Sequence, residues 1–111
     1  MNRRELIDHC LTYPDAYEDY PFDPLPDDNA TAVIRHKNNR RSFALIMRHN
    51  RMLYLNLKCD PFEAELLRQA YHDLIPGWHM NKRHWNTVVM GGDVPQDEIE
   101  RMIRVSWQLT L

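Results

Sequence analysis

Three consecutive segments of alternating hydrophobicity restrict the folds open to this chain. Residues 32–37, 42–48 and 52–58 carry the β-branched, aromatic and leucine-rich patterns that are typical of strands. Asparagine-containing turns at residues 38–39 and 49–51 separate them, and asparagine favours the tight turns that join antiparallel strands. The segments therefore predict two consecutive hairpins.

The third segment indicates which side chains share a face. Leu53, Leu55 and Leu57 alternate with polar or aromatic residues, so they point to one side of the sheet. The second segment is apolar on both faces, and keeping its odd-numbered residues beside the leucines requires Met47 to pair with Leu53. This register predicts an odd-numbered loop centred on Asn50.

The first hairpin completes the expected sheet. A two-residue turn at residues 38–39 pairs Arg35 with Ser42 and Val33 with Ala44. The face opposite the leucines is then expected to be cationic, with aromatic or apolar residues between the charges. Its expected members are Val33, Arg35, Lys37, Ala44, Ile46, Arg48, Tyr54, Asn56 and Lys58.

Helix signals lie on both sides of the three segments. Asn2 and Glu5 form an asparagine variant of the capping box, which begins a helix that ends near residue 12. Asp60 followed by Pro61 begins a second helix, which we expect to reach about Leu74. The residues expected to be buried along this helix are Phe62, Leu66, Leu67, Ala70 and Tyr71.

The C-terminal third adds one strand and one helix. Residues 86–90 contain a β-branched run, Thr87-Val88-Val89, and after Gly91-Gly92 an acidic first turn opens a final helix. Its expected buried face contains Ile99, Met102, Ile103, Ser106, Trp107 and Leu109. The order of elements predicts a single α+β domain over residues 1–111, with helices covering one face of an antiparallel sheet.

Composition and cysteine usage bound the class of protein. Hydrophobic residues make up 43% and charged residues 27% of the chain, which is typical of a globular domain. Cys10 and Cys59 form no CxxC motif, which favours reduced thiols and a cytoplasmic location. The first residues match neither a signal peptide nor a membrane span, so no membrane partner is expected.

Charge is unevenly distributed along the chain. Residues 1–30 hold eight acidic and two basic residues, whereas residues 31–58 hold seven basic residues and no acid. Residues 13–29 form a proline-rich acidic connection, which we expect Tyr17, Tyr20 and Phe22 to hold against the body. The fold is therefore expected to have a basic zone.

The stretch from Pro76 to Val88 has the most unusual composition, with two Trp, two His, two Asn, one Lys and one Arg. Tryptophan is typical of positions where its ring is covered and its N–H has a partner. We expect Trp85 to lie in the core and Trp78 to cover the second helix. Residues 81–84 between them are then presented as a fixed basic loop, which makes them a candidate binding site.

Nucleic acid is the ligand class that this distribution favours. Binding requires several cations spaced to meet successive phosphates, with stacking or hydrogen-bonding groups between them. The candidate nucleic-acid-binding residues are Arg35, Lys37, Arg40, Arg41, Arg48, Arg51, Tyr54, Lys58, Asn81, Lys82, Arg83 and His84. Solubility is the alternative role of such cations on a sheet. No recognition helix is apparent, so major-groove reading of sequence is not expected.

The run Asn81-Lys82-x-His84-Trp85-x-Thr87-Val88 resembles the MmcQ/YjbR family. The Asp60-Pro61 helix start and the last helix, which ends Ser106-Trp107 where the family usually has Ser-Tyr, extend the resemblance over essentially the whole chain. The resemblance implies a frataxin-like, double-wing sandwich. It also implies a DNA-binding role.

Together these observations predict a non-enzymatic protein that binds DNA or another polyanion, as a monomer or weak homodimer. No nucleophile elbow or phosphate-binding glycine loop is present, so no catalytic residue, metal or other cofactor is predicted. A protein-interaction module is one alternative. Cation binding, which the frataxin likeness suggests, is another; its acidic candidates are Asp15, Glu18, Asp19, Asp23, Asp27 and Asp28.

Overall fold

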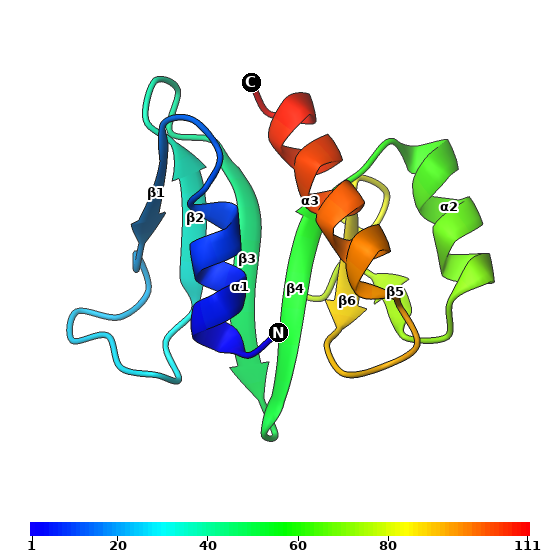
Figure 1. Cartoon of the computed structure of the whole chain (residues 1–111), viewed down its shortest axis with the longest axis horizontal. Helices are drawn as coiled ribbons and strands as arrows, with labels where there is room; N and C mark the ends of the chain where they lie inside the picture. Colours follow the sequence, from blue (N-terminus) through cyan, green and yellow to red (C-terminus); the bar gives the residue numbers. More distant parts are fainter.

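The computed structural model describes residues 1–111 as one six-stranded antiparallel sheet with three helices on one face (Figure 1). The helices are α1 (Arg3–Cys10), α2 (Pro61–Ala70) and α3 (Gln96–Leu109). The strands are β1 (Ala16–Asp19), β2 (Ala32–His36), β3 (Ser42–His49), β4 (Met52–Lys58), β5 (Leu74–Pro76) and β6 (Trp85–Val89), in the sheet order β1-β2-β3-β4-β6-β5. The predicted α+β class is confirmed.

Helices α1 and α2 begin where a side-chain cap satisfies free backbone N–H groups. The Asn2 side chain accepts from the Glu5 amide at 2.8 Å, and the Asn2 amide donates to the Glu5 carboxylate at 3.0 Å, so the predicted capping box is confirmed. Asp60 likewise accepts from two amides of the first turn of α2. The start of α3 follows Pro95 without a side-chain cap.

The predicted end of α2 is wrong, and its predicted buried face is confirmed at Leu67 but wrong at Phe62 and Leu66. Tyr71 has extended dihedral angles, so the helix stops at Ala70 and Leu74 instead enters β5. Ala64 and Leu67 are the residues that α2 buries, since this is the side that packs on β5 and β6. Phe62 is 72% exposed and Leu66 is 48% exposed.

Two short strands were not predicted. β1 lies within the acidic connection and pairs with β2, and β5 pairs with β6 at the other edge. Tyr20, just beyond β1, packs against the core as expected, but Phe22 is 72% exposed, so its expected anchoring role is wrong. Each of these short segments becomes a strand because its backbone hydrogen-bonds to the free edge of a longer neighbouring strand.

The expected β3–β4 register is wrong by one residue. Asn50 and Arg51 have φ of 49° and 66°, and this pair of left-handed residues forms a two-residue turn of the kind that closes hairpins. Arg48 therefore pairs with Leu53, and Met47 pairs with Tyr54. Since side chains alternate along a strand, the shift exchanges the two faces of β3.

The β2–β3 hairpin is partly as expected. Arg35 pairs with Ser42, which is confirmed, but the register shifts between Ile34 and Arg35, so Val33 pairs with Leu45 and its expected pairing with Ala44 is wrong. Phe43 is the additional residue of this bulge and packs beside His36, with ring centroids 5.1 Å apart.

The main core lies between the sheet and the helices and contains 21 buried residues. α1 packs on β2 and β3, α3 on β3 and β4, and α2 on β5 and β6 (Figure 1). We call the helix-packed side of the sheet the covered face and the other side the open face. None of the three helices combines the length and apolar character needed to cross a bilayer.

Candidate nucleic-acid interface

The open face is aromatic and apolar at its centre and carries few cations. The registers place these side chains on it: Tyr17, Asp19, Val33, Arg35, Ser42, Leu45, Met47, His49, Met52, Tyr54, Asn56, Lys58, Ile75, Trp85, Thr87 and Val89. The expectation of a cationic face is therefore corrected. Ala44 and Ile46 belong to the covered core, and Arg48 also lies on the covered side.

Trp78 is the centre of an aromatic cluster on the open face. The loop between β5 and β6 places its ring 5.2 Å from Tyr54 and 4.9 Å from His49, measured between centroids. The ring of His79, at the exposed edge of the loop, lies 4.2 Å from that of Trp78. Four aromatic rings from three segments are thus in contact.

Hydrogen bonds from β4 and β6 fix Trp78 in this position. The Trp78 amide donates to the Thr87 hydroxyl at 2.8 Å, and the Asn56 side-chain amide donates to the Trp78 carbonyl at 3.0 Å. The Thr87 hydroxyl in turn donates to the Asn56 side-chain carbonyl. Asn56 and Thr87 are fully buried, so removing either partner would leave polar groups unsatisfied.

A second set of contacts attaches the loop to α2. Arg68 donates to the Asn86 side chain at 2.6 Å and to the Trp85 carbonyl at 3.2 Å, and also to the Lys82 carbonyl. Arg68 is absent from the predicted site residues, because nothing in the helix pattern distinguishes it from a solvated arginine.

The loop also approaches the start of β6 closely at Gly77. A Cβ atom on Gly77 would lie 2.7 Å from the Cβ of Trp85, so the close approach of these two residues requires glycine.

The expected roles of both loop tryptophans are corrected. Trp85 does begin β6, but its pairing with Lys58 places it on the open face, where it is half-buried and outside the main core. Trp78 contacts the open face of the sheet and not α2. Both errors follow from the assumption that large rings lie on the side that helices cover.

The structure separates the predicted cations into several groups. Arg35 is on the open face, where it pairs with Asp19 at 2.8 Å. Lys37, Arg40 and Arg41 occupy the β2–β3 turn. Arg51 is at the tip of the β3–β4 hairpin, whereas Lys58 ends β4. The hairpin tip and the end of β4 are opposite ends of the open face, roughly 23 Å apart at about 3.3 Å per residue.

The polar groups of residues 81–84 mostly stabilise their own loop. The Asn81 side chain accepts from the Arg83 amide at 3.0 Å, and Lys82 donates to the Gly77 carbonyl at 3.1 Å. The His84 carbonyl accepts from the Cys59 amide at 2.8 Å. Arg83 lines a shallow groove beside α2 with Phe62. The loop is therefore fixed, as predicted, with the Lys82 side chain bonded inside it, whereas the Arg83 guanidinium forms no hydrogen bond or ion pair.

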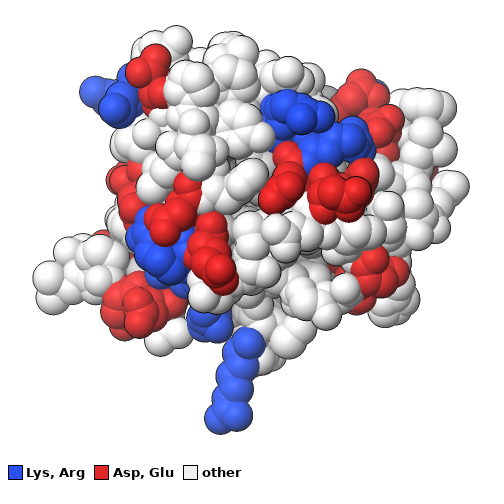
Figure 2. Space-filling model, in the orientation of Figure 1, with Lys and Arg blue, Asp and Glu red and all other residues white.

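Acidic and basic side chains also alternate on the covered face. Figure 2 shows blue residues with red neighbours over the helices, and isolated blue side chains only near the β3–β4 hairpin at the lower edge. Among the acidic candidates, Asp19 pairs with Arg35 and Glu18 pairs with Arg4. No three His, Cys, Asp or Glu side chains are grouped closely enough to hold a metal.

Both cysteines are buried, and their surroundings favour the protonated thiol. Burial raises the pKa of Cys10 to about 12 and, with help from nearby carboxylates, that of Cys59 to about 11. The thiolate is the nucleophilic form, so neither side chain is prepared for thiol chemistry at neutral pH.

Comparison with known proteins identifies the family. The YjbR family model matches residues 11–109. This chain belongs to the YjbR family. It is 31% identical to the uncharacterized protein YyaQ of Bacillus subtilis over 99% of this chain and 98% of that one. It is 32% identical to the uncharacterized protein YjbR of Escherichia coli K12, over 97% of this chain and 86% of that one.

Solved structures of relatives have the same fold. A crystal structure of a Pseudomonas syringae protein matches with a TM-score of 0.85 and 33% identity, over 100% of both chains. A crystal structure of a Deinococcus radiodurans protein matches with a TM-score of 0.80 and 35% identity, over 96% of this chain and 75% of that one. The names of these relatives assign no ligand.

Proposed function

We propose that this protein binds single-stranded nucleic acid on the open face of its sheet and catalyses no reaction. The observation that carries the proposal is the aromatic cluster of Trp78, Tyr54, His49 and His79, which is held rigidly on that face. Unpaired bases stack on aromatic rings whatever their sequence, and each stack contributes about 1–3 kcal/mol. Arg51 and Lys58 lie beyond the two ends of the cluster, where a strand's phosphates would continue.

The charge distribution favours a single strand over a duplex. A duplex binds through many phosphate contacts on a continuous cationic surface, and its bases are stacked on one another. Here Arg35 is paired with an acid, Lys82 is bonded within its loop, and Arg48 is on the covered side. The buried cysteines, with their raised pKa values, support a non-enzymatic role. Cytoplasmic location stays a prediction.

Binding of a labelled thymidine oligonucleotide and of a duplex of equal length, at about 50 and 200 mM salt, tests the proposal. We expect the single strand to bind more tightly and to weaken as salt rises. Tyr54→Ala and Trp78→Ala should each lower its affinity about 5- to 100-fold. Arg51→Ala and Lys58→Ala should each reduce the salt slope by about 0.7 for every phosphate that the variant no longer neutralises.

Phe62→Ala is the matched control, because Phe62 is an exposed aromatic residue on α2, away from the open face. It should bind the oligonucleotide like the wild-type protein. Absence of binding at low salt, or an equal loss of affinity with Phe62→Ala and Tyr54→Ala, would overturn the proposal. Absence of binding would favour the protein-interaction alternative, for which Phe62 and Leu66, one turn apart on α2, are the first residues to substitute.

A further inference from the structure

Two adjoining grooves lie on the covered side, between the start of α1 and the β3–β4 hairpin. Their volumes are about 470 Å³ and about 270 Å³, and they share Asn2, Arg3 and Arg48 as a common wall. The larger groove is also lined by Arg4, by Tyr20 and by residues 26–28, and no residue of the Trp78 cluster contributes to it. It is therefore a site separate from the open face.

The common wall contains two arginines, Arg3 and Arg48, whose side chains form no direct ion pair. The Arg48 side chain is exposed and forms no hydrogen bond or ion pair, and the Arg3 guanidinium donates to the Ala30 carbonyl at 2.8 Å. Arg51 extends the same wall along the smaller groove. Guanidinium groups bind phosphate and carboxylate with paired, charge-assisted hydrogen bonds, so this wall suits an anion.

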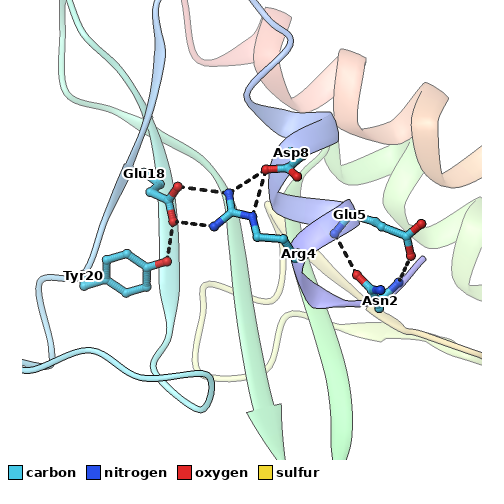
Figure 3. A network of polar contacts seen from close by, with 6 residues as sticks. All are labelled: Asn2, Arg4, Glu5, Asp8, Glu18 and Tyr20. Atoms are coloured by element: carbon cyan, nitrogen blue, oxygen red, sulfur yellow. Dashed lines mark hydrogen bonds and ion pairs between the residues drawn. The ribbon is translucent and has the colours of Figure 1, made fainter.

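Arg4, in the same groove, differs from Arg3 and Arg48 because its side chain is paired with acidic residues. Its guanidinium lies between Asp8, at 2.7 Å, and Glu18, at 3.1 Å (Figure 3). These bonds raise the pKa of Arg4. Burial alone would raise the pKa of Glu18, but hydrogen bonds from Arg4 and Tyr20 outweigh burial and lower it. Arg4 is therefore already paired, and an anionic group of a ligand would bind to Arg3 and Arg48 instead.

The opposite wall of the larger groove is acidic. Asp27 and Asp28 are exposed there and form no ion pair, and one Asp27 oxygen accepts from the Asn29 amide at 2.8 Å. The bond from Arg3 to Ala30 and the prolines at positions 24 and 26 restrict this loop. Carboxylates accept hydrogen bonds and do not bind anions, so this wall suits hydroxyl groups.

We propose that the larger groove binds a sugar phosphate, with its phosphate on Arg3 and Arg48 and its hydroxyl groups on Asp27 and Asp28. A groove with an arginine wall opposite a carboxylate wall matches a small ligand that has an anionic end and a hydroxyl-rich end. The inference does not rest on nucleic-acid binding, because the Trp78 cluster lies on the other side of the sheet and Arg51, at the hairpin tip, lines only the smaller groove.

An NMR titration with ribose 5-phosphate tests the inference, with ribose, inorganic phosphate and glutamate as comparison probes. Ribose 5-phosphate should shift the amides of residues 2–5 and 27–30 in a saturable way, with at least about tenfold higher affinity than inorganic phosphate. Ribose alone should not saturate the site. Arg48→Ala should weaken binding at least about tenfold, and Arg104→Ala, an exposed arginine on α3, should not.

The double variant Asp27→Asn/Asp28→Asn separates the two walls, because asparagine keeps the oxygen that accepts from Asn29. It should weaken ribose 5-phosphate binding while leaving inorganic phosphate binding equal or tighter. No saturable shift up to about 20 mM, or an equal effect of Arg48→Ala and Arg104→Ala, would overturn the inference. Tighter binding of glutamate than of ribose 5-phosphate would also overturn it, since a carboxylate wall holds an ammonium group equally well.

Discussion

The two faces of the sheet are built from the same strands but are stabilised in different ways. On the covered face, Ile46 and Leu55 are fully buried among apolar side chains from the helices. On the open face, the neighbouring Asn56 is equally buried, but it is bonded to Thr87 and to the Trp78 loop. The covered face therefore supplies most of the stability, and the open face uses polar contacts to orient aromatic rings.

The largest expected difference between the faces concerns adjacent residues of β3. Ile46→Ala should lower the free energy of unfolding by about 2–5 kcal/mol, because it leaves a cavity in the core. Met47→Ala, on the open face, should lower it by less than about 1.5 kcal/mol. Denaturant unfolding measures both. The reverse order would mean that β3 has the opposite face toward the helices.

Breaking the polar contacts of the open face should have the next largest effect. Asn56→Ala removes the donor to the Trp78 carbonyl and the acceptor of the Thr87 hydroxyl, so we expect the free energy of unfolding to fall by about 2–3 kcal/mol. Asn38→Ala, an exposed asparagine without a side-chain hydrogen bond, should change stability by less than about 0.5 kcal/mol. If thermal unfolding showed the same stability for Asn56→Ala and Asn38→Ala, the position of the Trp78 loop would not depend on Asn56.

A smaller effect is expected where the loop approaches β6. Gly77→Ala places a methyl group 2.7 Å from the Trp85 Cβ, so the loop must shift, at a cost of about 1–2 kcal/mol. The shift should also move Trp78 away from Tyr54 and change the fluorescence of the protein. Unchanged stability and fluorescence would contradict the close approach.

The smallest expected effect depends on pH and concerns the covered face. His36 is 1% exposed beside Thr110, and burial, aided by Arg41, lowers its pKa. Below the ordinary value of 6.5 the unfolded chain gains this proton first, so stability should fall as the pH decreases from 7 toward 5. His36→Gln should flatten that slope in pH-dependent denaturation. An unchanged slope would exclude His36 as its source.

Much of the covered face was predictable from local signals. The caps at Asn2 and Asp60 and the leucine alternation of β4 place α1, the start of α2 and the core side of β4 correctly. These signals are strong because each involves residues a few positions apart. The class of the fold follows from their order along the chain.

The open face was not predictable, because it depends on register and on distant partners. β3 is apolar on both sides, so only the left-handed pair at Asn50-Arg51 and the bulge at Phe43 fix which residues face the helices. β1 and β5 are short and become strands only through pairing. The Trp78 cluster needs both the register and the buried Asn56, which resembles any polar strand residue in the sequence.

The indole N–H signals of the three tryptophans provide the most direct test of nucleic-acid binding on the open face. Trp78 and Trp85 lie on that face, whereas Trp107 of α3 stacks on Tyr13 on the covered side, with centroids 5.5 Å apart. During an NMR titration with a thymidine oligonucleotide, the Trp78 signal should move and saturate while the Trp107 signal stays fixed. Movement of Trp107 without Trp78, or of neither, would contradict binding on the open face.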